Sequence, residues 1–386
     1  MDIAPEFRII LKSFLLTGTF FFNPKEKKQK TSIFVKATSI TKMLVETLFI
    51  LYAVYVIYSS IYLGPYASKT LRITSVTISA ILLLLRLSFF AYKSRTLKTL
   101  SKLRDFRTMS FGPRQQIRTP LRKYAVCACG LCIFFPISVA ASSMAIIWKN
   151  IGKYEFVRVT NNSTTATYAL NTIILSVHQM MYMINFYMFP GLVMTVICFV
   201  YLSYVHSFLR HLEMIRLRLS QRFCEAEMSR ALEVFTVARK IHQDIEKSVS
   251  FVTFVVYVLI FGSILHLVCA SVSNFLSDEP NMRDAYSITI FSWTATWFVV
   301  LTMCGSQVAR NEVFIKNMGQ EICGANPEGP RKLICLNFFD SCSGFRMRFT
   351  GWGMFEVNQQ LLLTVSGVLI TYGVLFASEL QKTSSN

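Results

Sequence analysis

The sequence predicts an all-α membrane protein with seven transmembrane helices, a cytoplasmic N-terminus and an extracellular C-terminus. Three observations carry this prediction. The 386 residues are 53% hydrophobic and only 16% charged, the chain contains seven long apolar runs, and Lys and Arg gather in alternate loops. One water-soluble core cannot bury this much apolar surface, so we expect lipid to be the solvent.

Each of the seven apolar runs reaches the length that a helix needs to cross a bilayer, about 20 residues. A spanning helix also satisfies every backbone polar group internally, which suits such uninterrupted runs. The fourth run is long enough to tilt or to project from the bilayer, and we expect Pro190 to kink it. The predicted spans are residues 43–63, 73–92, 124–148, 170–205, 249–275, 287–309 and 352–378.

The loops set the orientation. Those that precede the first, third, fifth and seventh spans contain 32 Lys and Arg residues, and the segments on the opposite side contain seven. Basic loops stay in the cytoplasm, which places the N-terminus inside, the reverse of a G-protein-coupled receptor. The same loops explain the net charge of +19 through contact with anionic lipid headgroups. No groove-reading motif accompanies the charge, so nucleic acid is not an expected partner.

This topology divides the chain into functional regions. The apolar run 14–22 is expected to be an interfacial amphipathic segment, because a basic stretch follows it and no signal-peptide cleavage site does. Apolar residues at helical spacing in 206–248 predict helices that prolong the fourth and fifth spans into the cytoplasm. The expected regions are a cytoplasmic segment 1–42, a ligand-binding bundle 43–309 that includes the extensions 206–248, a cytoplasmic anchor 310–350, a pore-forming helix 351–380 and an extracellular tail 381–386.

Motifs for catalysis and metal binding are absent from the sequence. We find no phosphate-cradling glycine loop, serine elbow, His-Glu-x-x-His helix or paired carboxylates, so an enzyme is not predicted and no cofactor is expected. The cysteines lie in predicted spans or on the cytoplasmic side, without zinc spacing, which predicts neither extracellular disulfides nor a metal site. Asn161 and Asn162 each begin a glycosylation sequon in a loop predicted to lie outside.

Polar and aromatic residues inside the spans are the candidate ligand-binding groups. Arg86 is the clearest case, since a central Arg costs about 2.5 to 3.5 kcal/mol on insertion scales and therefore faces protein or water. It either bonds a carbonyl or hydroxyl of another helix or lines a cavity. In the outer helix halves, hydrogen-bonding and aromatic groups together predict a pocket that opens outward. The candidates for binding are Arg72, Arg86, His178, Gln179, Tyr182, Trp293 and Trp297, with Thr77, Ser143, Asn171 and His266 beside them.

The last fifty residues contain a recognisable pattern. The run 349–358, FTGWGMFEVN, is followed by Leu361-Leu362 and by Thr371-Tyr372 with five apolar residues after it. This pattern resembles the carboxyl-terminal signature of insect gustatory receptors, seven-transmembrane chemoreceptor ion channels related to insect odorant receptors. The family pattern closes with Gln-Phe. Here Ser378 and Glu379 stand in that place, so ion selectivity is not readable from the pattern.

The resemblance implies a ligand-gated, non-selective cation channel in the plasma membrane of gustatory sensory neurons, built as a homotetramer or a heterotetramer with related receptors. By this resemblance the seventh span surrounds the pore. Leu375 then falls at an apolar gate, Ser378 faces the pore, and Glu379 lies just outside it, attracting the permeating cations. The small-molecule tastant would bind between the outer helix halves.

Scarce carboxylates in the outer helix halves favour an apolar bitter compound slightly over a sugar. Two other functions stay open. A solute transporter would show an internal repeat and mid-membrane carboxylates, and the sequence shows no convincing repeat. A metabotropic seven-helix receptor would require an external N-terminus.

Overall fold

The computed structural model describes residues 3–21, 33–62, 69–109, 121–149, 165–221, 225–276, 283–323 and 331–384. Within these ranges seven helices are long and apolar enough to cross a membrane. The chain is otherwise helical in these ranges apart from one two-stranded ribbon and short connections. The predicted all-α fold with seven transmembrane helices is confirmed.

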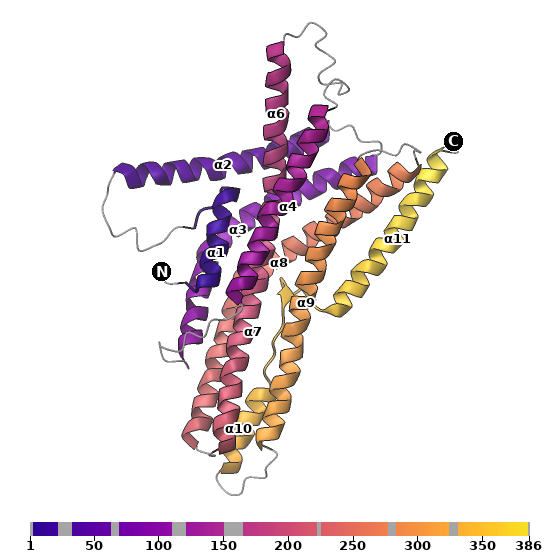
Figure 1. The fold of residues 1–386 in the computed structure, drawn as a ribbon. Coiled ribbons are helices and arrows are strands. Elements are labelled where there is room, and N and C mark those ends of the chain that lie inside the picture. The colour runs from indigo at the N-terminus through magenta and orange to yellow at the C-terminus, as the bar shows by residue number, and fades with distance from the viewer. Residues whose placement is uncertain are drawn as a thin grey trace.

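The helices follow one another with short irregular elements between them (Figure 1). Two short helical turns, η1 and η4, and two strands complete the order. In chain order the elements are α1 (Pro5–Ser13), η1 (Phe14–Thr17), α2 (Ile33–Tyr62), α3 (Lys69–Met109), α4 (Leu121–Lys149), α6 (Thr165–Met183), η4 (Ile184–Met188), α7 (Phe189–Gln221), α8 (Glu225–Leu276), α9 (Arg283–Cys323), α10 (Arg331–Ser343), β1 (Thr350–Gly351), β2 (Phe355–Glu356) and α11 (Gln359–Ser384).

Helix α7 lies at the centre of the bundle, α6 projects from it, and α11 stands at its edge (Figure 1). Of the most apolar stretch of each spanning unit, 94% is buried in α6–α7 and only 6% in α11. Phe189, Leu192 and Val193 begin α7 with no exposed surface. One apolar helix is therefore enclosed by its neighbours, whereas another leaves its surface open.

The fourth predicted span is interrupted near its middle. Residues Ile184–Met188 form the wider π turn η4 between α6 and α7. Pro190 follows it and lacks the backbone N–H that a regular helix would donate to the carbonyl of Phe186. Turns of this kind cause helix kinks and often occur at functional sites. The π turn η4 thus ends two residues before Pro190, the residue from which the sequence predicted a kink.

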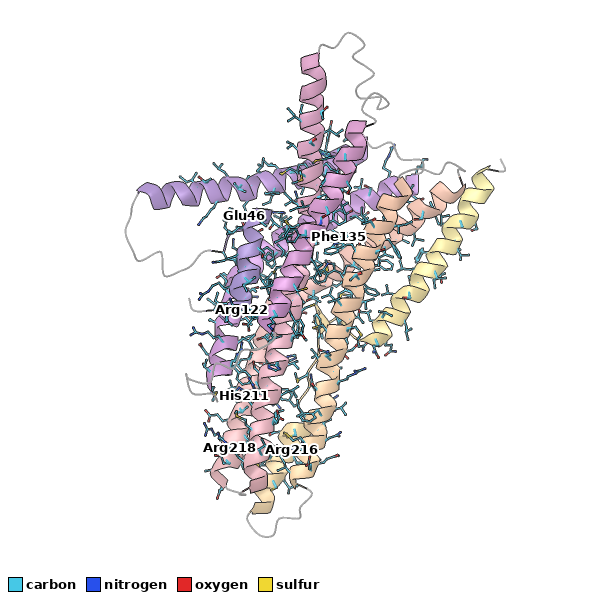
Figure 2. All side chains as sticks on the ribbon, in the orientation of Figure 1. Glu46, Arg122, Phe135, His211, Arg216 and Arg218 are labelled. Atoms are coloured by element: carbon cyan, nitrogen blue, oxygen red, sulfur yellow. The ribbon has the colours of Figure 1, made fainter. Side chains whose placement is uncertain are left out.

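Long helices extend beyond the apolar stretches into a second bundle. The lower ends of α7, α8 and α9 lie together with α10 in Figure 1. Aromatic rings fill its interior: the ring centroid of Phe235 lies 5.5 Å from Phe208, 5.6 Å from Phe338 and 5.6 Å from Phe345. Figure 2 shows His211, Arg216 and Arg218 at this end, where Arg216 pairs with Glu321 at 2.6 Å. The bundle contains the described parts of the predicted extensions, residues 206–221 and 225–248.

A small β-hairpin joins this bundle to the last helix. Strands β1 and β2 pair antiparallel, and Trp352 and Gly353 make the turn with φ angles of 53° and 71°. The hydroxyl groups of Tyr201 and Thr350 both donate to the carboxylate of Glu246, which fastens the hairpin to α7 and α8. Helix α11 therefore begins at Gln359, and the predicted start of the seventh span at residue 352 was wrong. Positive φ angles and strand pairing exclude a helix there.

One face of the N-terminal segment packs against the bundle. Phe7, Ile10 and Phe14 are at most 1% exposed, and Glu6 pairs with Arg107 of α3 at 2.8 Å. Phe14 stacks on Phe89 with 5.0 Å between ring centroids. Leu15 and Leu16 on the other face are 51% and 53% exposed, so the interfacial interpretation of residues 14–22 stays a prediction.

Candidate functional site

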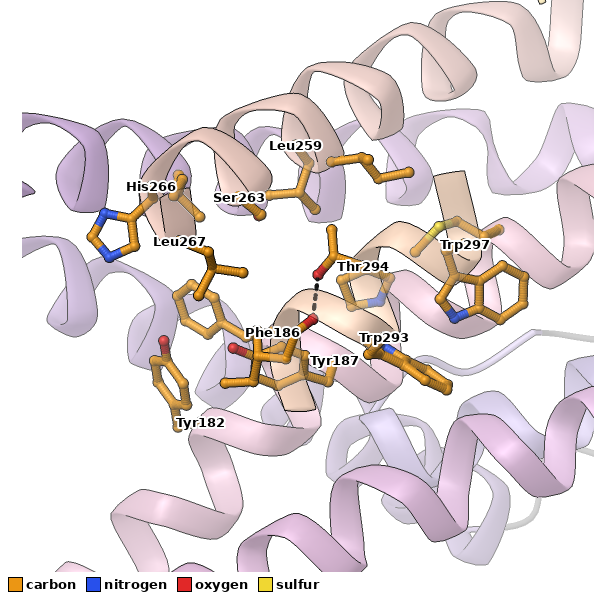
Figure 3. A pocket seen from close by; sticks show the side chains of 15 residues that line it. Tyr182, Phe186, Tyr187, Leu259, Ser263, His266, Leu267, Trp293, Thr294 and Trp297 are labelled. Carbon is orange, nitrogen blue, oxygen red and sulfur yellow. Dashed lines mark hydrogen bonds between the residues drawn. The ribbon is translucent and has the colours of Figure 1, made fainter. Parts of the chain in front are cut away.

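The main pocket lies between the end of α6, η4, α7, α8 and α9, with one residue from α3 (Figure 3). Its empty volume is about 620 Å³, including space open to the surroundings. Several helices thus meet around one cavity, the usual arrangement of ligand sites between helices. The lining residues are Ile78, Tyr182, Phe186, Tyr187, Pro190, Met194, Leu259, Ile260, Ser263, His266, Leu267, Ile290, Trp293, Thr294 and Trp297.

Aromatic rings form two walls of the pocket. Tyr182 and Phe186, one helical turn apart, stack with their centroids 4.3 Å apart. Across from them, Trp293 and Trp297 of α9 meet edge to face at 5.8 Å, and Phe135 of α4 stacks on Trp293 at 4.4 Å. Stacked and edge-to-face rings fix one another's orientation. The walls therefore offer flat apolar faces already held in place.

Few polar groups reach the pocket, and most of these have partners. His266 Nδ1 lies 2.7 Å from the hydroxyl of Thr74 on α3, and the hydroxyl of Thr294 donates to the carbonyl of Ile290 at 3.0 Å (Figure 3). Trp297 differs from them. Its indole Nε1 is buried and has no hydrogen-bond partner among the residues that the structure describes. None of the described lining residues is Asp, Glu, Lys or Arg.

The structure brings three of the predicted binding residues together and separates two others. Tyr182, Trp293 and Trp297 all line the main pocket. His178 and Gln179 sit on α6 but face other helices. The hydroxyl of Tyr52 donates to the His178 carbonyl at 2.9 Å, and Gln179 donates to the hydroxyl of Ser143 at 3.0 Å. These two side chains join helices outside the pocket lining.

The two predicted arginines also lie away from the main pocket. Arg72 is exposed near the start of α3. Arg86 is buried in a separate, smaller pocket between α2 and α3. Sequence reasoning overlooked most of the apolar lining, including Phe186, Tyr187 and Leu259, because such residues in a span look the same whether they face lipid, a core or a cavity.

The predicted pore residues lie on α11. Leu375 is 58% exposed, and Ser378 is exposed with its hydroxyl donating to the carbonyl of Leu375 at 2.7 Å. Glu379 lies in the same helix, and its side chain is beyond the described ones. The predicted glycosylation sites Asn161 and Asn162 lie outside the described residues.

Thr364, Thr371 and Ser378 recur every seven residues on α11 and are all exposed. A spacing of seven returns to nearly the same side of a helix. Their hydroxyls bond to carbonyls of their own helix, at 3.0 Å for Thr364 and 2.9 Å for Thr371. Leu375 follows Thr371 by one turn on that side. We call the residues Thr364, Thr371, Leu375 and Ser378 the α11 stripe.

The described residues contain no group of three or more His, Cys, Asp or Glu placed to hold a metal ion. Cys127 and Cys129 carry free thiols. The chemistry available at the main pocket is therefore that of apolar and aromatic contact with a small number of hydrogen bonds.

Comparison with known proteins finds similarity in fold only. No protein-family model and no curated protein matches the sequence. The chain resembles the solved structure of the insect olfactory receptor OR5 from Machilis hrabei in complex with eugenol, with a TM-score of 0.61 and 14% identity over 97% of both chains. A second structure of that receptor gives a TM-score of 0.58 over 96% of both chains. The seven-helix fold of an insect olfactory receptor thus extends over nearly the whole chain.

Proposed function

We propose that this chain is a subunit of a gustatory-type chemoreceptor, a ligand-gated cation channel of the plasma membrane that opens when a small-molecule tastant occupies the main pocket. The proposal rests on three observations: the carboxyl-terminal signature, the similarity in fold to an olfactory receptor, and the geometry of the main pocket and of the last helix. The exposure of the apolar helix α11 within its own subunit is the observation that most directly supports this proposal.

An apolar helix that is exposed within its own subunit needs other surroundings. Leu363, Ile370 and Val374 of α11 are 71%, 69% and 65% exposed. Lipid suits these apolar residues, but the α11 stripe presents three hydroxyl groups from another side of the same helix. Hydroxyl groups gain more from water or from a neighbouring subunit than from lipid tails. A ring of subunits with α11 at the centre satisfies both sides.

The α11 stripe has the composition expected of a gated pore. A ring of Leu375 side chains closes a narrow passage by excluding water, and a ring of Ser378 hydroxyls hydrates passing cations. Closed rotational symmetry places the same residue of every subunit around one axis. In a homotetramer, or a heterotetramer with related receptors, four copies of α11 would surround the pore.

Neighbouring residues of α8 connect the main pocket to α11. Leu267 lines the pocket. The next residue, Val268, lies against Gly373, where an added Cβ would be 3.1 Å from its Cγ1. A ligand that binds one arrangement of α8 more tightly than another therefore biases the position of α11 as well, which is the requirement for gating.

The lining of the main pocket favours a neutral, largely aromatic ligand. Flat rings and the absence of charged residues in the lining offer little to the many hydroxyl groups of a sugar. The structurally similar olfactory receptor was solved with eugenol. For this chain we propose an apolar bitter compound in preference to a sugar.

Whole-cell current recording tests the proposal. Cells that express the chain receive neutral aromatic compounds, other bitter compounds and sugars while G-protein signalling is blocked. We expect a rapid cation current that survives the block and that changes its ion selectivity in Ser378→Ala. A response abolished by the block would establish the metabotropic receptor instead. Uptake of the compound without channel-sized currents would establish the transporter.

A further inference from the structure

Hydrogen bonds join the extended segment before the hairpin to helix α8. In each of them an acceptor on α8 receives a hydrogen bond from the segment. We call these contacts the ladder: His242 Nε2 with the N–H of Arg348 at 3.4 Å, the Glu246 carboxylate with the Thr350 hydroxyl, and the Ser250 carbonyl with the N–H of Trp352 at 3.1 Å. The strand is therefore attached to one helix at successive positions.

The spacing of the ladder explains how a helix and a strand can match over this length. Its members on α8 are four residues apart, which places them on nearly the same side of the helix with a rise of about 6 Å per step. Its members on the segment are two residues apart, an advance of about 6.6 Å per step in an extended chain. Because the two steps are nearly equal, each member meets its partner.

Burial along the segment agrees with an extended conformation. Met347 and Phe349 are 1% and 2% exposed, whereas Arg348 between them is exposed. The ring of Phe349 packs on Tyr201 of α7 with 4.1 Å between centroids. The carbonyl of Phe349 also accepts the N–H of Val357 at 2.8 Å. The segment is thus held by its buried side chains, by the hairpin and by α8.

Little chain separates the ladder from the proposed pore helix. The hairpin closes at Val357, and α11 begins at Gln359. Between them Asn358 caps the helix, and its Oδ1 accepts the N–H of Leu361 at 3.1 Å. A displacement of the ladder would therefore be passed to the first turn of α11.

Helix α8 carries both the ladder and part of the main pocket. It runs without a break over Glu225–Leu276. Leu259, which lines the pocket, follows Ser250 by nine residues, about 14 Å along the helix. Farther along, Val268 lies beside Gly373 of α11. Helix α8 thus reaches α11 at two levels, and its pocket residues lie between them.

We propose that the ladder holds the base of α11 on α8 while the channel opens and closes, and that Glu246 is the positioning residue at its centre. The inference rests on the proposed channel function. Glu246 accepts hydroxyl groups from Tyr201 of α7 and from Thr350 of the segment, so one carboxylate joins three elements. With the base fixed, a shift of α8 at the pocket moves the outer part of α11, where Leu375 lies.

Hydrogen exchange tests the ladder without any ligand. The full-length chain in detergent is placed in deuterated water, and peptides that contain residues 347–352 are followed by mass spectrometry. Thr350→Val keeps the shape of the side chain but removes the donor to Glu246. We expect exchange in these peptides to become roughly tenfold faster, because a hydrogen bond to a charged group is lost. Thr350→Ser keeps the hydroxyl and should exchange like the wild type.

Thr236→Val is the matched control. Thr236 is an exposed threonine of α8, and its hydroxyl donates to the carbonyl of Leu232 within the same helix at 3.0 Å. This variant should leave exchange in residues 347–352 unchanged. Equal exchange in Thr236→Val and Thr350→Val would overturn the ladder.

A pair of cysteines tests the role of the ladder in gating. The hydroxyl oxygens of Ser250 and Thr350 lie 3.3 Å apart, so Ser250→Cys with Thr350→Cys places two sulfurs within reach of a disulfide. The current is evoked by the compound that gives the largest wild-type response in the recordings described above. The reduced pair lacks the Thr350 hydroxyl and should give a several-fold smaller maximal current. Oxidation with copper phenanthroline should restore the current, because a covalent bond replaces the lost contact.

Thr350→Cys alone is the control, and its smaller current should not respond to the oxidant. An unchanged maximal current in the reduced pair would overturn the proposal. So would a current that oxidation of the pair abolishes and a reductant returns, since the ladder would then have to open. Absence of any wild-type current, together with the expected exchange result, would count against the proposed channel function and not against the ladder.

Discussion

Trp297 is the lining residue of the main pocket whose indole N–H is buried without a partner among the described side chains and carbonyls. A buried donor without an acceptor costs free energy, and a ligand that brings an acceptor recovers it. The aromatic walls then supply affinity and Trp297 supplies a preference among apolar ligands. Specificity at this site would come from one hydrogen bond in a pocket that is otherwise tolerant.

We predict that Trp297→Phe, which keeps an aromatic ring but removes the donor, weakens activation by ligands that carry a carbonyl or ether oxygen. The expected loss is about 1 kcal/mol, roughly a fivefold rise in half-maximal concentration. Concentration–response curves of the evoked current measure it. A hydrocarbon analogue of the same shape serves as the control and should lose little. Equal losses for both ligands would contradict a hydrogen-bonding role.

His242 lies on the part of α8 that precedes the predicted span, and it titrates abnormally. Burial lowers the pKa of His242 from 6.5 to about 4. Its Nε2 accepts a hydrogen bond from the backbone N–H of Arg348 at 3.4 Å, which requires an unprotonated nitrogen. Between these two pKa values the unfolded chain binds a proton that the folded chain does not. The contribution of neutral His242 to the free energy of unfolding is therefore fully present above pH 6.5, and it is lost as the pH falls toward 4.

We predict that the solubilised protein loses about 2 kcal/mol of stability through His242 when the pH falls from 7.5 to 5. His242→Gln keeps an acceptor for the Arg348 N–H but does not titrate in this range. Unfolding midpoints of both proteins at the two pH values measure the difference. A wild-type protein no more acid-sensitive than His242→Gln would refute the role of this histidine.

At the scale of elements, the connection into α11 depends on a close approach of two backbones. A Cβ added at Gly305 of α9 would lie 2.1 Å from the carbonyl oxygen of Val357. Val357 N donates in turn to the carbonyl of Phe349 at 2.8 Å, which closes the hairpin segment. The segment that precedes the proposed pore helix is thus held directly against α9, which also lines the main pocket.

We predict that Gly305→Ala destabilises the protein by about 1 to 3 kcal/mol, since the new methyl group overlaps a backbone that cannot move away cheaply. The evoked current should fall as well, because the start of α11 is displaced. Gly130→Ala is the control. Its nearest contact would be an ordinary 4.0 Å, and alanine favours a helix over glycine. The midpoints of unfolding of the two variants are the measurement. Equal midpoints would contradict the proposed overlap between the new methyl group and the backbone of Val357.

At the scale of the whole molecule, the exposed apolar helix α11 requires an assembly. We predict that Leu375→Cys makes the open channel sensitive to a thiol-reactive reagent applied outside, because the proposed gate faces the pore. Ile370→Cys is the control. Ile370 is 69% exposed but lies about 140° around the helix from Leu375. Current before and after the reagent is the measurement. Block in both variants, or in neither, would contradict the pore assignment.

The orientation is a second whole-molecule prediction. The excess of basic loops places the N-terminus in the cytoplasm. An epitope tag at the N-terminus should bind antibody only after permeabilisation, and a tag at the C-terminus should bind on intact cells. Labelling in the reverse pattern would support a metabotropic receptor of the opposite topology.

Sequence and structure agree best on the helices themselves. Seven spans and the extension of α7 and α8 beyond the apolar stretches were predictable, since each depends on the composition and periodicity of one segment. Their ends were less predictable. The FTGWGMFEVN run was taken partly into the seventh span, although Trp352 and Gly353 adopt positive φ angles that form a hairpin turn. That conformation is supported by contacts with α8, which no local pattern records.

The candidate site was predicted only in part. Tyr182, Trp293 and Trp297 were identified because aromatic groups in outer helix halves are unusual enough to notice, whereas Phe186 and Leu259 read as ordinary apolar residues. His178 and Gln179 looked equally suitable and bond elsewhere. Which side of a helix meets a cavity depends on rotation and packing against several other helices.

The sequence by itself determined that the chain crosses a membrane seven times, which loops are basic, and which residues carry the chemoreceptor signature, because hydropathy, charge and motif belong to single segments. Only the tertiary structure decided that η4, α8 and α9 meet around one aromatic pocket, that Phe7, Ile10 and Phe14 are buried, that Arg86 lies away from that pocket, and that α11 stands open at the edge. These features are contacts between residues far apart in the chain. Their free energy depends on pairs and clusters that a linear sequence does not display.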